Sequence, residues 1–122
     1  MLTAYGPVYG LNDEMCMKIA SAFGAGMGYM QETCGAVTGA FMVIGLKHHT
    51  GSGDRSSRET VYRLVKEFVR AFESRTRSIK CRELLDFDIS TREGLEDARK
   101  SNIFKVCVDY VREAAGILER IL

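Results

Sequence analysis

Apolar side chains between Val61 and Phe72 recur at the spacing of one helix face, and this pattern constrains the fold more than any other feature. They fall at i, i+3, i+4, i+7, i+8 and i+11, while charged residues occupy the opposite positions. The same periodicity returns between Ile103 and Ile121. No segment shows the sustained alternation of a half-buried strand, so the sequence predicts an all-α fold.

Two further helices are predicted around a glycine-rich run, Phe23–Gly28, which we interpret as a turn because alternating glycines are costly inside a helix. Asn12 or Asp13 can cap the helix before this run. Its core face should contain Met15, Ile19, Ala22 and Phe23. The helix after the run extends from about Met30 to Leu46, and its small residues predict burial on nearly all sides.

Short helical segments are expected between the two long amphipathic patterns. One runs from Ser78 to Leu85, and the other from Ser90 to about Arg99 with an interruption at Gly94. Ser101 or Asn102 is expected to cap the last helix. The whole chain of 122 residues is predicted to be a single-domain helical bundle of about four main helices plus one or two short helices.

The charge balance gives no indication of a nucleic-acid partner or of a membrane surface. The chain has 17 basic and 16 acidic residues, a formal net charge of +1. Its most apolar stretch, Cys34–Leu46, is well short of the roughly 20 residues that span a bilayer, so no membrane insertion is expected. Met1–Gly10 lacks the features of a signal peptide, and a cytoplasmic location is the expectation.

The chain has four cysteines, and no two of them form a CxxC pair. In a reducing compartment such cysteines are metal ligands, reactive thiols or buried small side chains more often than structural disulfides. Cys34 opens a predicted helix, whose N–H groups and dipole should lower its pKa and favour the thiolate. Cys81 lies between two cationic residues, Lys80 and Arg82, which favour the thiolate in the same way.

The remaining candidates have simpler interpretations. Cys107 lies on the apolar stripe of the last helix, where packing is the favoured interpretation from the residues alone, and Cys16 is interpreted as packing as well. His48 and His49 could ligate a metal, but adjacent histidines in a polar loop are more often solvent-exposed. The Gly24–Gly28 run follows a helix and has the wrong spacing for a dinucleotide fingerprint.

The run that contains Cys34-Gly35-Ala36-Val37-Thr38-Gly39 resembles the C_GCAxxG_C_C family, whose hallmark is a Cys-Gly-Ala-x-x-Gly motif. The segments around Cys81 and Cys107 are similar to the family's later cysteine segments, in the same order. The resemblance extends from about Tyr9 onward. It implies a single domain and redox activity, with no substrate specified.

The resemblance also singles out the residues of a site. Three cysteines match the family pattern, namely Cys34, Cys81 and Cys107, and are the candidate catalytic residues or metal ligands. The candidate cofactor-binding glycines are Gly24, Gly26, Gly28, Gly35 and Gly39. The first three could bring the backbone and its N–H groups close to the Cys34 sulfur, and the last two leave a helix face with few side chains. The family's first cysteine lies in an earlier helix, which we expect this chain to lack.

Three functions remain open at this point. The first is thiol–disulfide exchange or electron transfer with an unknown redox partner. The second is binding of a metal ion or iron–sulfur cluster by the same thiolates. The third is a non-enzymatic dimerisation or interaction module, and a homodimer fits all three. Because the helix faces of Cys34 and Cys107 point inward, we expect them to converge with Cys81, whereas Cys16 should lie elsewhere.

Overall fold

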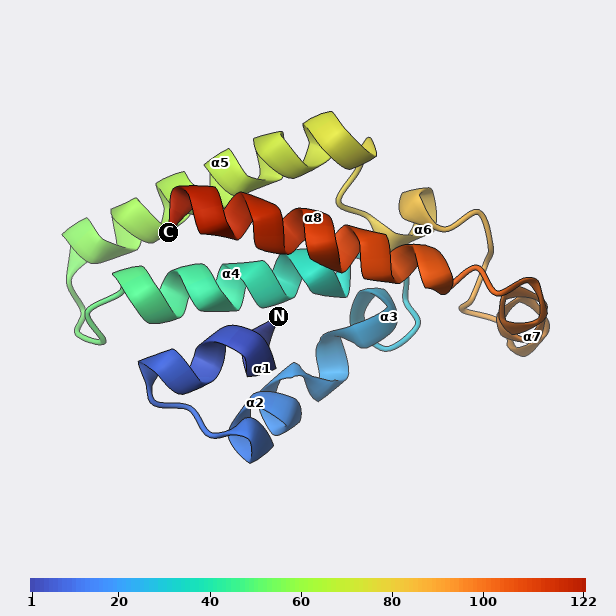
Figure 1. Cartoon of the computed structure of the whole chain (residues 1–122), viewed down its shortest axis with the longest axis horizontal. Helices are drawn as coiled ribbons and strands as arrows, with labels where there is room; N and C mark the ends of the chain where they lie inside the picture. Colours follow the sequence, from blue (N-terminus) through green and yellow to red (C-terminus); the bar gives the residue numbers. More distant parts are fainter.

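The computed structural model describes residues 1–122 and confirms the all-α prediction (Figure 1). There is no strand, and the one β-type contact is an isolated antiparallel bridge between Thr33 and Lys80. The α-helices are α1 (Leu2–Tyr5), α2 (Asp13–Ala20), α3 (Gly24–Met27), α4 (Gly35–His48), α5 (Arg55–Thr76), α6 (Cys81–Leu84), α7 (Arg92–Ser101) and α8 (Lys105–Ile121). Short 3-10 helices span Gly6–Tyr9 and Ser21–Phe23.

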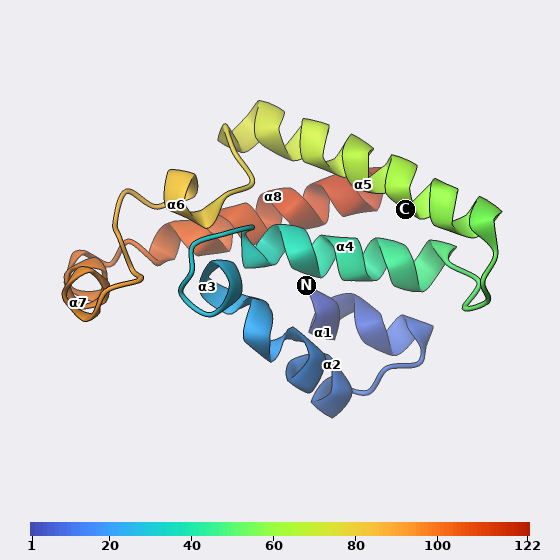
Figure 2. The ribbon, with the colours of Figure 1, turned by 180° about the vertical axis from the view of Figure 1, so that it is seen from behind.

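The core is formed by the three long helices α4, α5 and α8, which lie side by side in both views (Figures 1 and 2). The amphipathic face predicted for α5 is the buried one, with Leu64, Phe68 and Phe72 inside. Phe68 packs edge-on against Phe41, with ring centroids 6.0 Å apart, and stacks with Phe72 at 5.9 Å. The pairing of Phe41 with Phe68 therefore adds a ring–ring interaction to the apolar burial that stabilises the contact between α4 and α5.

Helix α4 is covered on more than one side, as its lack of a polar face predicts. Beyond the core contacts with α5 and α8, α1 lies against it (Figure 1). A Cβ atom on Gly39 would lie 2.7 Å from Cβ of Met1, so the glycine allows this close approach. The sequence patterns do not predict α1, because four residues are too few to show a helical period.

The predicted core face of α2 is wrong. Met15 and Ile19 are 46% and 42% exposed, whereas Cys16 is completely buried. Asn12 caps the helix as predicted, since its side chain accepts a hydrogen bond from the backbone N–H of Met15. A Cβ on Gly6 would come within 2.5 Å of the Cys16 Sγ, so Cys16 packs under the N-terminal segment, and its interpretation as a packing residue is confirmed.

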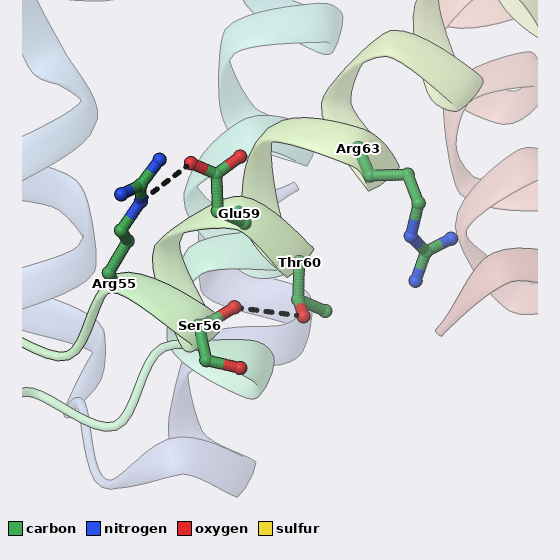
Figure 3. A pocket seen from close by; sticks show the side chains of 5 residues that line it. All are labelled: Arg55, Ser56, Glu59, Thr60 and Arg63. Atoms are coloured by element: carbon green, nitrogen blue, oxygen red, sulfur yellow. Dashed lines mark hydrogen bonds and ion pairs between the residues drawn. The ribbon is translucent and has the colours of Figure 1, made fainter.

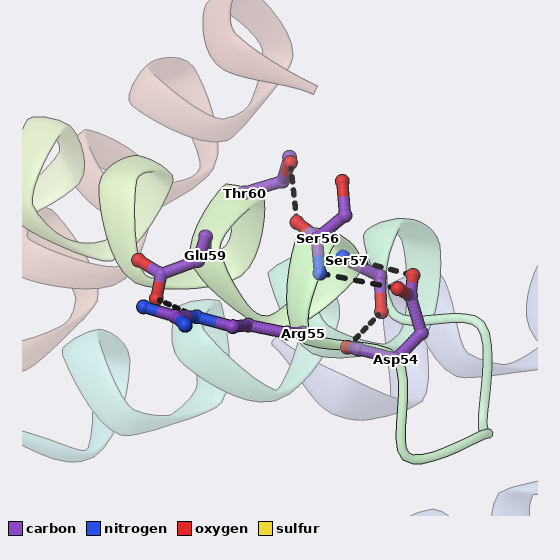
Figure 4. Close-up of polar contacts among 6 residues, drawn as sticks. All are labelled: Asp54, Arg55, Ser56, Ser57, Glu59 and Thr60. Atoms are coloured by element: carbon purple, nitrogen blue, oxygen red, sulfur yellow. Dashed lines mark hydrogen bonds and ion pairs between the residues drawn. The ribbon is translucent and has the colours of Figure 1, made fainter.

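Helix α5 begins at a well-formed cap. The Asp54 carboxylate accepts hydrogen bonds from the backbone N–H groups of Ser56 and Ser57, at 3.1 and 3.0 Å (Figure 4). In the next turn Arg55 pairs with Glu59, and the Thr60 hydroxyl donates to the Ser56 carbonyl. The two bonds to Asp54 satisfy N–H groups that every helix start leaves free.

Helix α7 lies at the far end of the molecule from the α4–α5 connection (Figures 1 and 2). Its last residue is Ser101, and Asn102 follows as a C-cap with a left-handed backbone. Helix α8 begins only at Lys105, so the predicted cap of the last helix at Ser101 or Asn102 is wrong. Gly94 does not interrupt α7. A Cβ there would meet the Asp88 carbonyl oxygen at 1.7 Å, so the glycine lets the preceding loop close onto the helix.

No helix combines the length and the apolar character needed to cross a membrane. The expected homodimer stays a prediction.

Replacing Phe68 by alanine should lower the free energy of unfolding by about 3–5 kcal/mol, because it removes a completely buried ring from the α4–α5 interface. Tyr62 lies on the same helix and is 56% exposed, so Tyr62→Ala should change stability by less than about 1 kcal/mol. Urea denaturation followed by circular dichroism measures both. Equal losses in the two variants would contradict this description of the core.

Candidate functional site

The bridge between Thr33 and Lys80 brings two of the candidate cysteines together. The backbone N–H of Cys34 donates to the Ile79 carbonyl, and that of Cys81 donates to the Glu32 carbonyl, each at 2.7 Å. Side chains alternate between the two faces of such a pairing, so Cys34 and Cys81 lie on the same face. Diagonal neighbours of this kind have Cα atoms about 7–8 Å apart, slightly beyond the usual range for a disulfide.

Cys107, in the first turn of α8, completes the group. Cys34, Cys81 and Cys107 all line one cavity of about 270 Å³. Its other walls are small or apolar: Ala25, Gly26, Gly35, Ala36, Leu85, Phe104 and Val111. The predicted convergence of three cysteines is thus confirmed, and Cys16 is not part of the cavity. All four cysteines are free thiols.

The glycine-rich run forms a left-handed turn against Cys81. Residues 25–29 all have positive φ, between 54° and 67°, including the non-glycine residues Ala25, Met27 and Tyr29. Such a conformation costs roughly 1–2 kcal/mol at each non-glycine residue. At Gly26 a side chain would also be blocked, since a Cβ would lie 2.7 Å from Cβ of Cys81. Gly26 therefore permits the turn to pack directly on the site.

The five candidate glycines do not act together. Gly26 and Gly35 line the cavity, whereas Gly24, Gly28 and Gly39 do not. The N–H groups at the Cys34 sulfur are those of Ala36 and Val37, in the first turn of α4, and not those of the glycine run. That part of the expectation is wrong, and cofactor binding by these glycines stays a prediction.

Burial decides the acidity of Cys34. It raises the pKa of the thiol above its ordinary value, while hydrogen bonds from the backbone N–H groups of Ala36 and Val37 oppose this rise. The sequence-based expectation of a lowered pKa is therefore wrong. The helix N-terminus is present as predicted, but the apolar walls of the cavity outweigh it.

The other two thiols are affected by burial and by their neighbours. The pKa of Cys81 is raised to about 11, first by burial and then by the charges of Cys34 and Cys107. A hydrogen bond from Gln31 and the charge of Arg82 lower it only in part. The pKa of Cys107 is raised by burial and by the charge of Cys34. The pKa of Cys34, by contrast, is shifted by burial and by the two backbone N–H groups.

Gln31 is a site residue that the sequence gives no signal for. Its side chain is only 5% exposed. The amide nitrogen donates to the Phe87 carbonyl at 2.8 Å, and the amide oxygen accepts from the backbone N–H of Ile89 at 3.0 Å. Through its further hydrogen bond to Cys81, Gln31 connects the cavity to the loop between α6 and α7.

The cationic neighbours of Cys81 are not free. The Arg82 guanidinium pairs with Glu32 at 2.5 Å and donates to the carbonyl oxygens of Met30 and Gln31. Lys80 is exposed on the other face of the bridge. The predicted stabilisation of the Cys81 thiolate by flanking cations is therefore weaker than the effect of burial.

The predicted metal ligands are not arranged as a metal site. No group of three or more His, Cys, Asp or Glu side chains is placed to hold a metal ion, so binding by Cys34, Cys81 and Cys107 would require the sulfurs to move. His48 is the last, half-buried residue of α4, so its predicted place in an exposed loop is wrong, and His49 follows it as the exposed C-cap. Both lie at the end opposite Cys34, about 20 Å away along the helix, and cannot supply a ligand. Metal or iron–sulfur binding stays a prediction.

A larger surface hollow along α5 lacks reactive groups. It measures about 690 Å³ and is lined by Arg55, Ser56, Glu59, Thr60 and Arg63 (Figure 3). Arg55 is paired with Glu59, and the N–H groups of the helix start are taken by Asp54 (Figure 4). We therefore place the candidate site at the cysteine cavity.

Comparison with known proteins identifies the family of the chain. No curated protein and no solved structure matches the chain. The sequence profile of the C_GCAxxG_C_C family, described as "Putative redox-active protein", matches residues 1–121. Since the match covers almost the entire chain, the protein belongs to the C_GCAxxG_C_C family.

Proposed function

We propose that the protein carries out thiol–disulfide exchange at the cysteine cavity, with Cys34 as the attacking thiolate. The observation that supports this most is the convergence of three free thiols on one cavity, where the N–H groups of Ala36 and Val37 at the start of α4 favour the thiolate of Cys34. Cys34 is also partly exposed, whereas Cys81 is buried, so a reactant from solution reaches Cys34 more easily. The redox partner is not specified by these features.

The reaction has three steps. The Cys34 thiolate attacks one sulfur of a disulfide R–S–S–R, which forms a mixed disulfide and releases RS⁻. A neighbouring thiol, whose raised pKa keeps it protonated at neutral pH, gives its proton to RS⁻ and becomes a thiolate. This thiolate attacks the Cys34 sulfur, forms an internal disulfide and releases a second RS⁻. Two protein thiols are oxidised, and one disulfide is reduced to two thiols.

Cys81 and Cys107 are both candidates for the second thiol. Cys81 is the diagonal neighbour of Cys34 on one face of the bridge, and such neighbours have Cα atoms about 7–8 Å apart, so a small backbone movement would join them. Cys107 is on a different helix, and its charge raises the pKa of Cys81. The thiol of either residue can give its proton to the leaving group, because both line the cavity.

Cysteine variants test the order of attack. With a small disulfide, Cys34→Ser should abolish mixed-disulfide formation, because the first thiolate is missing. Replacing the second thiol, in Cys81→Ser or Cys107→Ser, should instead trap the mixed disulfide on Cys34. Intact-protein mass spectrometry after an acid quench measures each species.

Cys16→Ala is the control for these variants, since Cys16 is buried away from the cavity and its loss should leave the reaction unchanged. Mixed disulfide forming in Cys34→Ser at the rate of the unmodified protein would refute the proposed role of Cys34.

The alkylation rate of Cys34 should rise with a midpoint above the roughly 8.5 of a free thiol, because burial favours the protonated form. In Cys34→Ser the midpoint for Cys107 should move to lower pH, since the charge that raises its pKa is gone. Peptide-resolved mass spectrometry after iodoacetamide treatment at a series of pH values measures both.

The same shifts affect stability. A raised pKa means that the folded state holds its thiol protons more tightly, so this contribution to stability is present below about pH 8.5 and is lost toward pH 11.

In the alkylation experiment, a midpoint for Cys34 at or below that of a free thiol would contradict the burial argument.

A further inference from the structure

We infer that the disulfide reduced at this cavity is a low-molecular-weight one whose entering group is uncharged and apolar. This inference rests on the proposed function and names its substrate class. The walls of the cavity consist of the three cysteines and of small or apolar residues, with no charged side chain. A charged group that entered would lose water without gaining a partner.

The charge of Arg82 acts on Cys81, but this arginine cannot replace that missing partner. Arg82 is paired with Glu32 and bonded to two backbone carbonyls, and Arg77 is paired with Asp86. The N–H groups at the start of α4 already face the Cys34 sulfur, which needs them as its charge develops. An anionic substrate would have to compete with these existing contacts.

The volume limits the size of the entering group. About 270 Å³ is at the lower end for a ligand pocket, which typically has 300–1,000 Å³. One arm of a small disulfide, such as a single aromatic ring, fits this description. Phe104, Leu85 and the half-exposed Val111 supply the apolar contacts for such a group.

The chemistry of the exchange agrees with an uncharged substrate. In an apolar cavity each additional charge is unfavourable, and the exchange moves a single negative charge from Cys34 to the released thiolate and then to the second thiol. An uncharged disulfide therefore reacts with only one negative charge in the cavity at any time. A carboxylate on the substrate would add a second charge close to the first.

Two chromogenic aromatic disulfides provide the test: dithiodipyridine, which is uncharged, and dithiobis(nitrobenzoate), which carries two carboxylates. We expect the ratio of their rates at Cys34 to exceed, by about tenfold or more, the same ratio for an uncharged cysteine derivative in water. Rates measured with Cys34→Ser are subtracted to isolate Cys34. The net charge of the chain is only +1, so long-range attraction or repulsion contributes little to this ratio.

Val111→Lys places a cation on the cavity wall and should lower the ratio toward that of the free thiol. Val108→Lys is the matched control: Val108 is on the same helix and 50% exposed but does not line the cavity, so its ratio should stay that of the unmodified protein. A ratio equal to that of the free thiol, with Cys34 still reacting, would overturn this inference and leave the proposed function intact. No reaction of Cys34 with either disulfide would overturn both.

Discussion

Two backbone hydrogen bonds, between residues 32–34 and residues 79–81, hold the cysteine cavity together. They use the N–H groups of Cys34 and Cys81 themselves, and α4 and α6 each begin at this point. Segments separated by 45 or more residues in the sequence are thus fixed next to each other. Without this pairing, Cys34 and Cys81 would have no shared face, and the left-handed turn at Gly26 would have no surface to pack on.

Burial and hydrogen bonding oppose each other at the site. The apolar walls raise the pKa of all three thiols, and the first turn of α4 opposes this only at Cys34. The N–H groups of Ala36 and Val37 thus distinguish Cys34 from the other two thiols, in a cavity whose walls contain no histidine or carboxylate.

The sequence predicts those parts of the fold that depend on long periodic patterns. The helix around Leu64 and Phe68 follows directly from its apolar spacing. The helix predicted from about Met30 begins only at Gly35, because the residues before it pair with the segment that precedes α6. The buried face of α2 is not predicted correctly, because eight residues with mixed apolar positions do not define one face. The N-terminal segment covers Cys16 and leaves the predicted face exposed. Short elements depend on tertiary contacts that the sequence pattern does not record.

The site was predicted in part for the same reason. Motif resemblance and helix faces identify Cys34, Cys81 and Cys107, but not the acidity of the thiols, because burial by Leu85, Phe104 and Val111 appears only in the folded chain. Gln31 was missed because one glutamine in a loop carries no pattern, and its role comes from contacts with residues 56 and 58 positions away.

Redox titration tests the central claim most directly. The protein is equilibrated in buffers with increasing ratios of oxidised to reduced dithiothreitol, quenched with acid and mapped by peptide mass spectrometry. The account predicts a two-electron transition in which Cys34 forms a disulfide with Cys81 or Cys107, while Cys16 remains a thiol. If all three cavity cysteines remain thiols across the whole series, or if the disulfide that forms excludes Cys34, the account is contradicted.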